Sequence, residues 1–230
     1  MAHLPYVQYE DAAPEVKVLF DSCERMLGRV ANAIRVAAHS PKIAQALVGL
    51  LVPTNRAEIT EVLDIRTKAL VILKTSILNG CDYCVGHNSA LGRSIGFKDD
   101  EIDAIGGDYQ SSNYFSDPEK AAIAWAECLT ERTYRQNPGA MARLKEHYDE
   151  AQIVEITMVS GFFNFWNRFT DGLQIDLESS DSVGKIQKSK IINPDDYVEF
   201  MRNCWWREND KTEAEATAGE LARGSTAEAK

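Results

Sequence analysis

Residues 69–88 have the sequence ALVILKTSILNGCDYCVGHN, which joins an apolar run to two cysteines and a histidine. The length and apolar character of its first half fit a buried helix. The Asn-Gly pair that follows is a turn signal, so Cys81 stands at the start of a new element. If that element is a helix, Cys81, Cys84 and His87 follow at i, i+3 and i+6 and lie close enough to share a patch.

This arrangement of two thiols and an imidazole favours redox chemistry. Unpaired backbone N–H groups and the positive end of the helix dipole stabilise a thiolate at a helix start. A neighbouring imidazole such as His87 can take a thiol proton near neutral pH. A zinc site is one alternative, but structural zinc usually takes four ligands and the other cysteines and histidines form no second pair. An inert, packed cysteine pair is the other alternative.

The pattern of apolar residues along the whole chain is that of an all-α protein. No stretch shows sustained period-two alternation with hairpin turns, so the βαβ surroundings of a thioredoxin-type CxxC are missing. Pro53 is expected to close one helix, and residues 179–182 are expected to form a loop. The predicted helices cover residues 14–27, 29–38, 41–52, 64–78, 81–95, 98–105, 116–129, 137–147 and 151–173, with a short piece from Pro194.

The composition is that of an ordinary soluble globular protein, with 44% hydrophobic and 26% charged residues among 230. A net charge of −10 argues against a nucleic-acid binder, which normally needs a basic face. The first residues lack the features of a signal peptide, and no apolar run approaches the roughly 18 residues of a membrane helix. We therefore expect a cytoplasmic protein without membrane contact, in which the single cysteines Cys23, Cys128 and Cys204 are small buried hydrophobes.

The chain divides into three parts by composition. Residues 1–178 are expected to form one helical domain. Residues 179–207 carry Tyr197, Phe200 and two tryptophans, and we expect this segment to dock on the body or on another subunit. Residues 208–230 contain no aromatic side chain, and we expect them to form a disordered tail.

Residues 69–88 resemble the core motif of the carboxymuconolactone decarboxylase superfamily, in its alkyl hydroperoxidase D-like branch. Residues 96–102 and 117–122 resemble the continuation of that motif, and residues 161–168 resemble the asparagine-bearing helix of peroxidase-related members. The resemblance covers roughly residues 15–178. It implies an all-helical alkyl hydroperoxidase D-like fold that assembles into a homo-oligomer, a trimer or a hexamer.

The resemblance also implies roles for the site residues. Cys84 would attack the oxygen of a hydroperoxide, Cys81 would resolve the sulfenic acid as an intramolecular disulfide, and an external dithiol would reduce that disulfide. His87 would assist the deprotonation of Cys84, and no cofactor or metal is implied. The family's glutamate, twelve residues before the first cysteine, is Ala69 in this chain, and the family's usual histidine position is Asn88. The motif therefore assigns no acid to support His87.

Two other functions stay open at this stage. A carboxymuconolactone decarboxylase-type lyase acting on a small lactone or ring acid would not need the cysteines, and the sequence identifies no group that would recognise the acid. A non-catalytic helical assembly protein would carry unreactive thiols. Asn164 and Asn167, one helical turn apart, are expected either to line a pocket or to form hydrogen bonds between helices. We expect His39, His147, Trp166 and Arg168 to be packing or surface residues.

Overall fold

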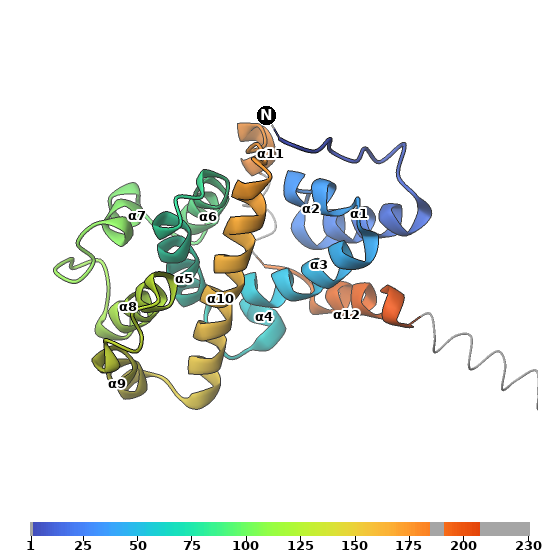
Figure 1. The fold of residues 1–230 in the computed structure, drawn as a ribbon. Helices are drawn as coiled ribbons and strands as arrows, with labels where there is room; N and C mark the ends of the chain where they lie inside the picture. The colour runs from blue at the N-terminus through green and yellow to red at the C-terminus, as the bar shows by residue number, and fades with distance from the viewer. Residues whose placement is uncertain (1, 185–190, 208–230) are drawn as a thin grey trace, which may run out of the picture.

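The computed structural model describes residues 2–184 and 191–207, and over these ranges it contains helices and no strand (Figure 1). The predicted all-α fold is thereby confirmed. The loop expected at residues 179–182 is wrong in part, because a short helix begins at Ser180. The elements are α1 Pro14–Leu27, α2 Asn32–Ala37, α3 Pro41–Asn55, α4 Ala57–Thr60, α5 Ile65–Leu78, α6 Asp82–Ser94, α7 Asp99–Gly106, α8 Asp117–Glu131, α9 Pro138–His147, α10 Glu150–Gly172, α11 Ser180–Gly184, α12 Pro194–Arg202 and the 3-10 turn η2 Trp205–Arg207.

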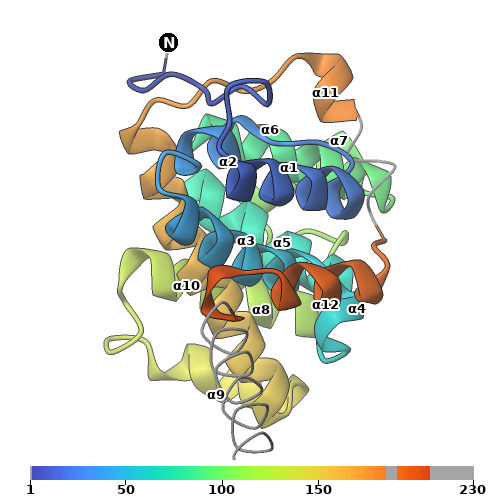
Figure 2. The same cartoon turned by 90° about the vertical axis from the view of Figure 1, so that its right-hand side faces the viewer.

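The long helix α10 runs through the middle of the molecule (Figure 1). Helices α5 to α9 lie on one side of it, and α1 to α4 with α12 lie on the other. It contacts α5, α6 and α8 on the first side and α3 on the second. The view turned by 90° shows α1, α3 and α12 together on one face, with α5 behind them (Figure 2). Residues on α10 are therefore placed to touch both halves of the molecule.

Helix α5 is the most deeply buried element, as its apolar sequence predicts. All residues from Thr67 to Ser76 are buried, including two lysines. Buried ammonium groups need charged or polar partners. Lys68 pairs with Glu155 of α10 and donates hydrogen bonds to the Pro53 and Arg56 carbonyls at 2.7 and 3.1 Å. The Lys74 ammonium lies 2.8 Å from a Glu127 carboxylate oxygen.

Helix α3 does not end at Pro53, so the predicted end of this helix is wrong. It continues to Asn55, although a proline has no N–H to donate to the carbonyl four residues earlier. That carbonyl belongs to Gly49, and the hydroxyl of Tyr197 on α12 donates to it at 2.7 Å. A tertiary contact thus satisfies the acceptor that would otherwise make an internal proline costly.

Helix α12 and η2 lie against the N-terminal half of the molecule. Helix α12 contacts α1 and α4, and Phe200 and Cys204 are each only 2% exposed. The tail expected at residues 208–230 lies outside the described residues. Over the described part of the chain, no helix has the length and apolar character needed to cross a bilayer.

Candidate active site

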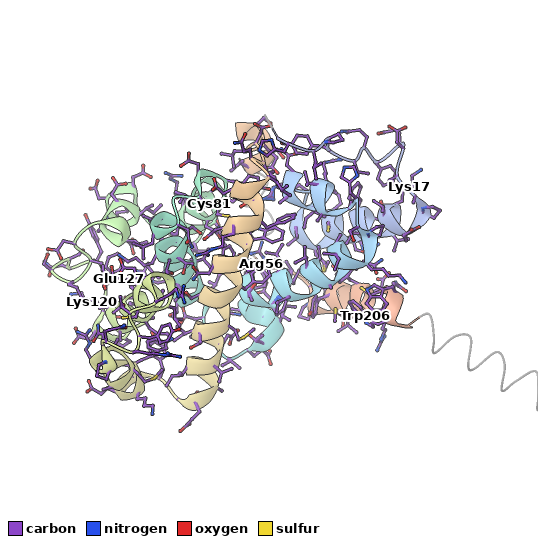
Figure 3. All side chains as sticks on the ribbon, viewed as in Figure 1. Lys17, Arg56, Cys81, Lys120, Glu127 and Trp206 are labelled. Carbon is purple, nitrogen blue, oxygen red and sulfur yellow. The ribbon has the colours of Figure 1, made fainter. Side chains whose placement is uncertain are left out.

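The two cysteines of the motif meet at the N-terminus of α6, next to α10. Cys81 is the N-cap residue, and its sulfur accepts the backbone N–H of Cys84 at a distance of 3.4 Å. The Thr170 hydroxyl of α10 lies 3.2 Å from the Cys81 sulfur and 3.5 Å from the Cys84 sulfur. Each cysteine is 1% exposed and carries a free thiol. Figure 3 shows Cys81 beside α10.

These contacts act on the two thiols in opposite directions. The hydrogen bond from the Cys84 side chain lowers the pKa of Cys81 to about 6 against the effect of burial, and the Thr170 hydroxyl and the Cys84 N–H lower it further. The same pairing with Cys81, together with burial, raises the pKa of Cys84. The two thiols therefore titrate as a coupled pair. After the first proton is lost, the negative charge lies mainly on the Cys81 sulfur.

His87 is held by oxygen acceptors at both ring nitrogens. Its Nδ1 lies 3.1 Å from the carbonyl oxygen of Tyr83, and its Nε2 lies 2.6 Å from a carboxylate oxygen of Glu178. Both ring nitrogens therefore face oxygen atoms, and neither of these two contacts involves a cysteine sulfur. To act as a base toward Cys84, His87 would first have to leave one of these partners.

Glu178 is the acid that sequence reasoning did not identify. Its carboxylate also accepts hydrogen bonds from the Tyr83 hydroxyl at 3.1 Å and from the backbone N–H of Asn32, at the start of α2. Burial alone would raise its pKa, but the hydrogen bond and charge of His87, with the Asn32 N–H, lower the pKa of Glu178 to about 2. The missing family glutamate at position 69 is thus replaced by an acid that lies far along the chain. Only the fold brings that acid to His87.

Cys84 and His87 line one cavity of about 90 Å³ between α6, α10 and the N-terminal helices. Cys81 does not line it. Its apolar walls include Leu27, Leu51 and Trp166. The remaining polar part of the lining consists of Arg29, Asn55, Arg56, Tyr83 and Asn88.

Two arginines in this cavity, Arg29 and Arg56, were not singled out from the sequence. Arg29 lies between α1 and α2 and Arg56 between α3 and α4, in segments that carry no motif. Asn88, at the family's usual histidine position, donates to the Cys84 carbonyl at 2.8 Å. Trp166 is buried in the core, and it also forms part of the wall beside Cys84.

The asparagines of α10 settle the choice left open by the sequence in favour of hydrogen bonds between helices. The Asn79 amide at the end of α5 donates to the side-chain oxygens of Asn164 and Asn167 at 3.1 and 3.0 Å. Cys23, Cys128 and Cys204 are buried, as predicted, and burial raises the pKa of Cys23 to about 12. Within residues 2–184 and 191–207, no three or more His, Cys, Asp or Glu side chains are grouped so that they could hold a metal ion.

Comparison with known proteins finds a family model that matches part of the chain. Residues 41–127 match the model of the carboxymuconolactone decarboxylase family. An uncharacterized protein of Bacillus subtilis, YdfG, is 29% identical over 105 residues, which cover 45% of this chain and 71% of YdfG.

Solved structures show the same fold. A protein of unknown function from Agrobacterium tumefaciens, suggested to be the antioxidant defence protein AhpD, superposes with a TM-score of 0.57 at 26% identity, over 63% of this chain and 96% of that one. An uncharacterized peroxidase-related protein from Silicibacter sp. TM1040 superposes with a TM-score of 0.67 at 19% identity, over 80% and 95% of the two chains. The resemblance seen in the sequence is confirmed: residues 41–127 match the carboxymuconolactone decarboxylase family, and the chain has an alkyl hydroperoxidase D-like fold.

Proposed function

We propose that the protein is a thiol peroxidase that reduces a small hydroperoxide through Cys84 and Cys81. The observation that carries the proposal is that the two cysteines differ in acidity and in access to the cavity. Cys81 is the better thiolate, because it receives the Cys84 N–H and the Thr170 hydroxyl, while Cys84 faces the cavity. The similarity to an antioxidant-type relative supports the same reading.

The proposed reaction starts from a thiolate at Cys81 and a thiol at Cys84. Cys84 passes its proton to Cys81 and attacks the terminal oxygen of the hydroperoxide. The S–O bond forms, the O–O bond breaks, and the leaving alkoxide takes the proton from Cys81 to become an alcohol. In this scheme Cys81 supplies the base that the sequence assigned to His87, whose ring nitrogens are occupied.

The second step closes the disulfide. The Cys81 thiolate attacks the sulfenic sulfur of Cys84, the S–S bond forms and hydroxide leaves, to be neutralised by a proton from His87 or from solvent. The pair has then given two electrons to the O–O bond. A resolving thiol with a pKa of about 6 is ionised at neutral pH and traps the sulfenic acid before further oxidation. An external dithiol returns the two electrons by exchange.

The test is hydroperoxide turnover with a small dithiol reductant, comparing the wild type with Cys84→Ser and Cys81→Ser. We expect Cys84→Ser to abolish turnover. In Cys81→Ser both the proton acceptor and the resolving thiol are lost, so we expect a slow single oxidation of Cys84 without turnover. Cys204→Ser, which removes a buried thiol outside the site, is the matched control. Equal rates in all four proteins would rule out the proposal.

A second candidate function is favoured by one observation. Arg29 and Arg56 line the cavity and supply the acid-recognising groups that the sequence did not reveal. A lyase of the carboxymuconolactone decarboxylase type, acting on a small lactone or ring acid, could use them. That activity would survive the loss of both cysteines, so the two serine variants also separate the candidates.

A further inference from the structure

Two arginines, Arg29 and Arg56, line the cavity beside Cys84. The Nε atoms of Arg29 and Arg56 are buried without a hydrogen-bond partner, and neither side chain forms an ion pair within the described residues. Arg56 is only 5% exposed, and its guanidinium makes one hydrogen bond, from Nη1 to the Asn55 carbonyl at 3.2 Å. Arginine is rarely buried without a partner, because removing its charge from water is costly.

The acids near the cavity do not supply the missing negative charge. No carboxylate is among the residues that line it. Glu178 is held by His87, Tyr83 and the Asn32 N–H. Burial lowers the pKa of Arg56 to about 10; the charge of Glu58 offsets part of this effect, and the charge of Arg29 adds to it. The charges of the two guanidinium groups thus repel each other, and the charge of Glu58 offsets this only in part.

The position of Arg56 is fixed by the fold. Its backbone carbonyl accepts a hydrogen bond from the buried ammonium of Lys68, which is itself paired with Glu155. Figure 3 shows Arg56 on the side of α10 where α3 and α4 lie. This contact fixes the backbone of Arg56, and the guanidinium that it carries offers a planar set of donors that matches a carboxylate.

The size of the cavity limits the ligand. A volume of about 90 Å³ has room for roughly six water-sized groups. Leu27, Leu51 and Trp166 offer apolar contact on the walls. The complementary molecule is a small, partly apolar anion.

We propose that this cavity binds a small carboxylate-bearing substrate, with the carboxylate on Arg56 and Arg29 and the reacting group at Cys84. The identity of the reacting group as a hydroperoxide rests on the proposed function. The preference for an anion does not, because it follows from the arginines alone.

Alkylation of Cys84 by iodoacetate and by iodoacetamide tests the anion preference directly. The two reagents are nearly the same size, and both form a sulfur–carbon bond while iodide leaves, but only iodoacetate carries a carboxylate. The readout is the ratio of the two alkylation rates at Cys84, located by peptide mass spectrometry, so thiol reactivity itself cancels. We expect the ratio of iodoacetate to iodoacetamide to exceed that of free cysteine.

Arginine variants identify the source of the preference. Arg56→Gln and Arg29→Gln should each lower the ratio by about tenfold, the effect of losing one charge-assisted hydrogen bond. Arg56→Lys should retain part of the preference, and Arg29, only partly buried, gives a second variant if Arg56→Gln does not fold. Arg93→Gln, which removes a surface arginine paired with Asp99, should leave the ratio unchanged. A wild-type ratio equal to that of free cysteine, or ratios unaffected in folded Arg29 and Arg56 variants, would overturn the proposal.

Turnover of a carboxylate-bearing alkyl hydroperoxide and of its methyl ester separates this proposal from the proposed function. We expect faster turnover of the acid and loss of that difference in Arg56→Gln. Equal turnover of the acid and the ester would support the peroxidase proposal and contradict the proposed preference for an anion. If neither hydroperoxide is consumed but the alkylation ratio still depends on the arginines, the anion site stands and the peroxidase proposal fails.

Discussion

Glu178 places a carboxylate directly beside the imidazole ring of His87. It is the only carboxylate that contacts His87 among the described residues, and its own pKa is lowered to about 2. The carboxylate also joins Tyr83 of α6 to the start of α2. One side chain thus holds the histidine, an aromatic wall of the cavity and the N-terminal helices together.

Replacing Glu178 by glutamine should destabilise the protein in a pH-dependent manner. Because the pKa of this carboxyl is lower in the folded than in the unfolded protein, its contribution is fully present above about pH 4.5 and is lost as the pH falls toward 2. We expect the variant to lose about 2–3 kcal/mol of unfolding free energy at pH 7. Urea unfolding at several pH values measures the difference between the two proteins, which should shrink on acidification.

The matched control for this variant is Glu199→Gln. Glu199 forms an ion pair with Arg25, and both side chains are largely exposed, so a small effect is expected at every pH. A difference between wild type and Glu178→Gln that does not change between pH 7 and pH 3 would show that the carboxylate is not ionised in the folded protein as described.

At the scale of elements, most helices could be predicted because local signals define their ends. Helix α1 begins and ends at the predicted residues, and Gly28 closes it in a left-handed conformation with φ of 70°. Helix α5 begins after the N-cap Asp64, whose side chain accepts the Thr67 N–H. Such signals lie within a few residues of the helix end, so the sequence alone reveals them.

The features that could not be predicted depend on contacts between distant segments. Helix α3 passes Pro53 because Tyr197 satisfies the freed carbonyl of Gly49. Glu178 reaches His87 only after the chain has turned back at the end of α10. In the same way, the cysteine pair could be predicted from the motif, but the two arginines that line the cavity could not.

Helix α6 offers a matched pair of glycines for testing how its two faces are packed. A Cβ added at Gly92 would lie 2.9 Å from Phe97, whose buried ring lies under the Arg66 guanidinium. A Cβ added at Gly86 would lie 2.8 Å from Leu177, a flexible side chain that is 45% exposed. Phe97 therefore has little freedom to move, whereas Leu177 can turn toward solvent.

We expect the two alanine variants to differ in stability. Gly92→Ala should lower the unfolding free energy by about 1–2 kcal/mol, because overpacking outweighs the gain in helix propensity. Gly86→Ala should be neutral, or stabilising by up to about 0.5 kcal/mol, because the propensity gain remains. Chemical denaturation of both variants measures this, and equal losses would contradict the packing described for α6.

At the scale of the whole molecule, α10 carries an apolar surface that residues 2–184 and 191–207 leave uncovered. Val154 is 62% exposed and Met158 is 48% exposed, and both line a groove with Leu50, Pro53 and Val62. Exposed apolar patches of this kind often mark interfaces between proteins. This surface supports the expectation of a homo-oligomer.

We predict that Val154→Glu and Met158→Glu shift the protein toward the monomer, because a carboxylate would be buried without a partner at the interface. Analytical ultracentrifugation gives the mass of the assembly for each variant. Val18→Glu, a change at an exposed valine of α1, should leave the mass unchanged. A wild type that sediments as a monomer would contradict the predicted assembly.

In the proposed cycle, the closed position of the thiol pair limits which molecules could reduce the disulfide back to two thiols. Exchange requires the incoming sulfur to approach one sulfur of the disulfide directly, and each cysteine is only 1% exposed. A folded protein surface is too broad to enter a cavity of about 90 Å³. In the proposed cycle the site would therefore act as a size filter on its electron donor: it would admit a slender dithiol on a narrow arm and exclude bulkier thiols.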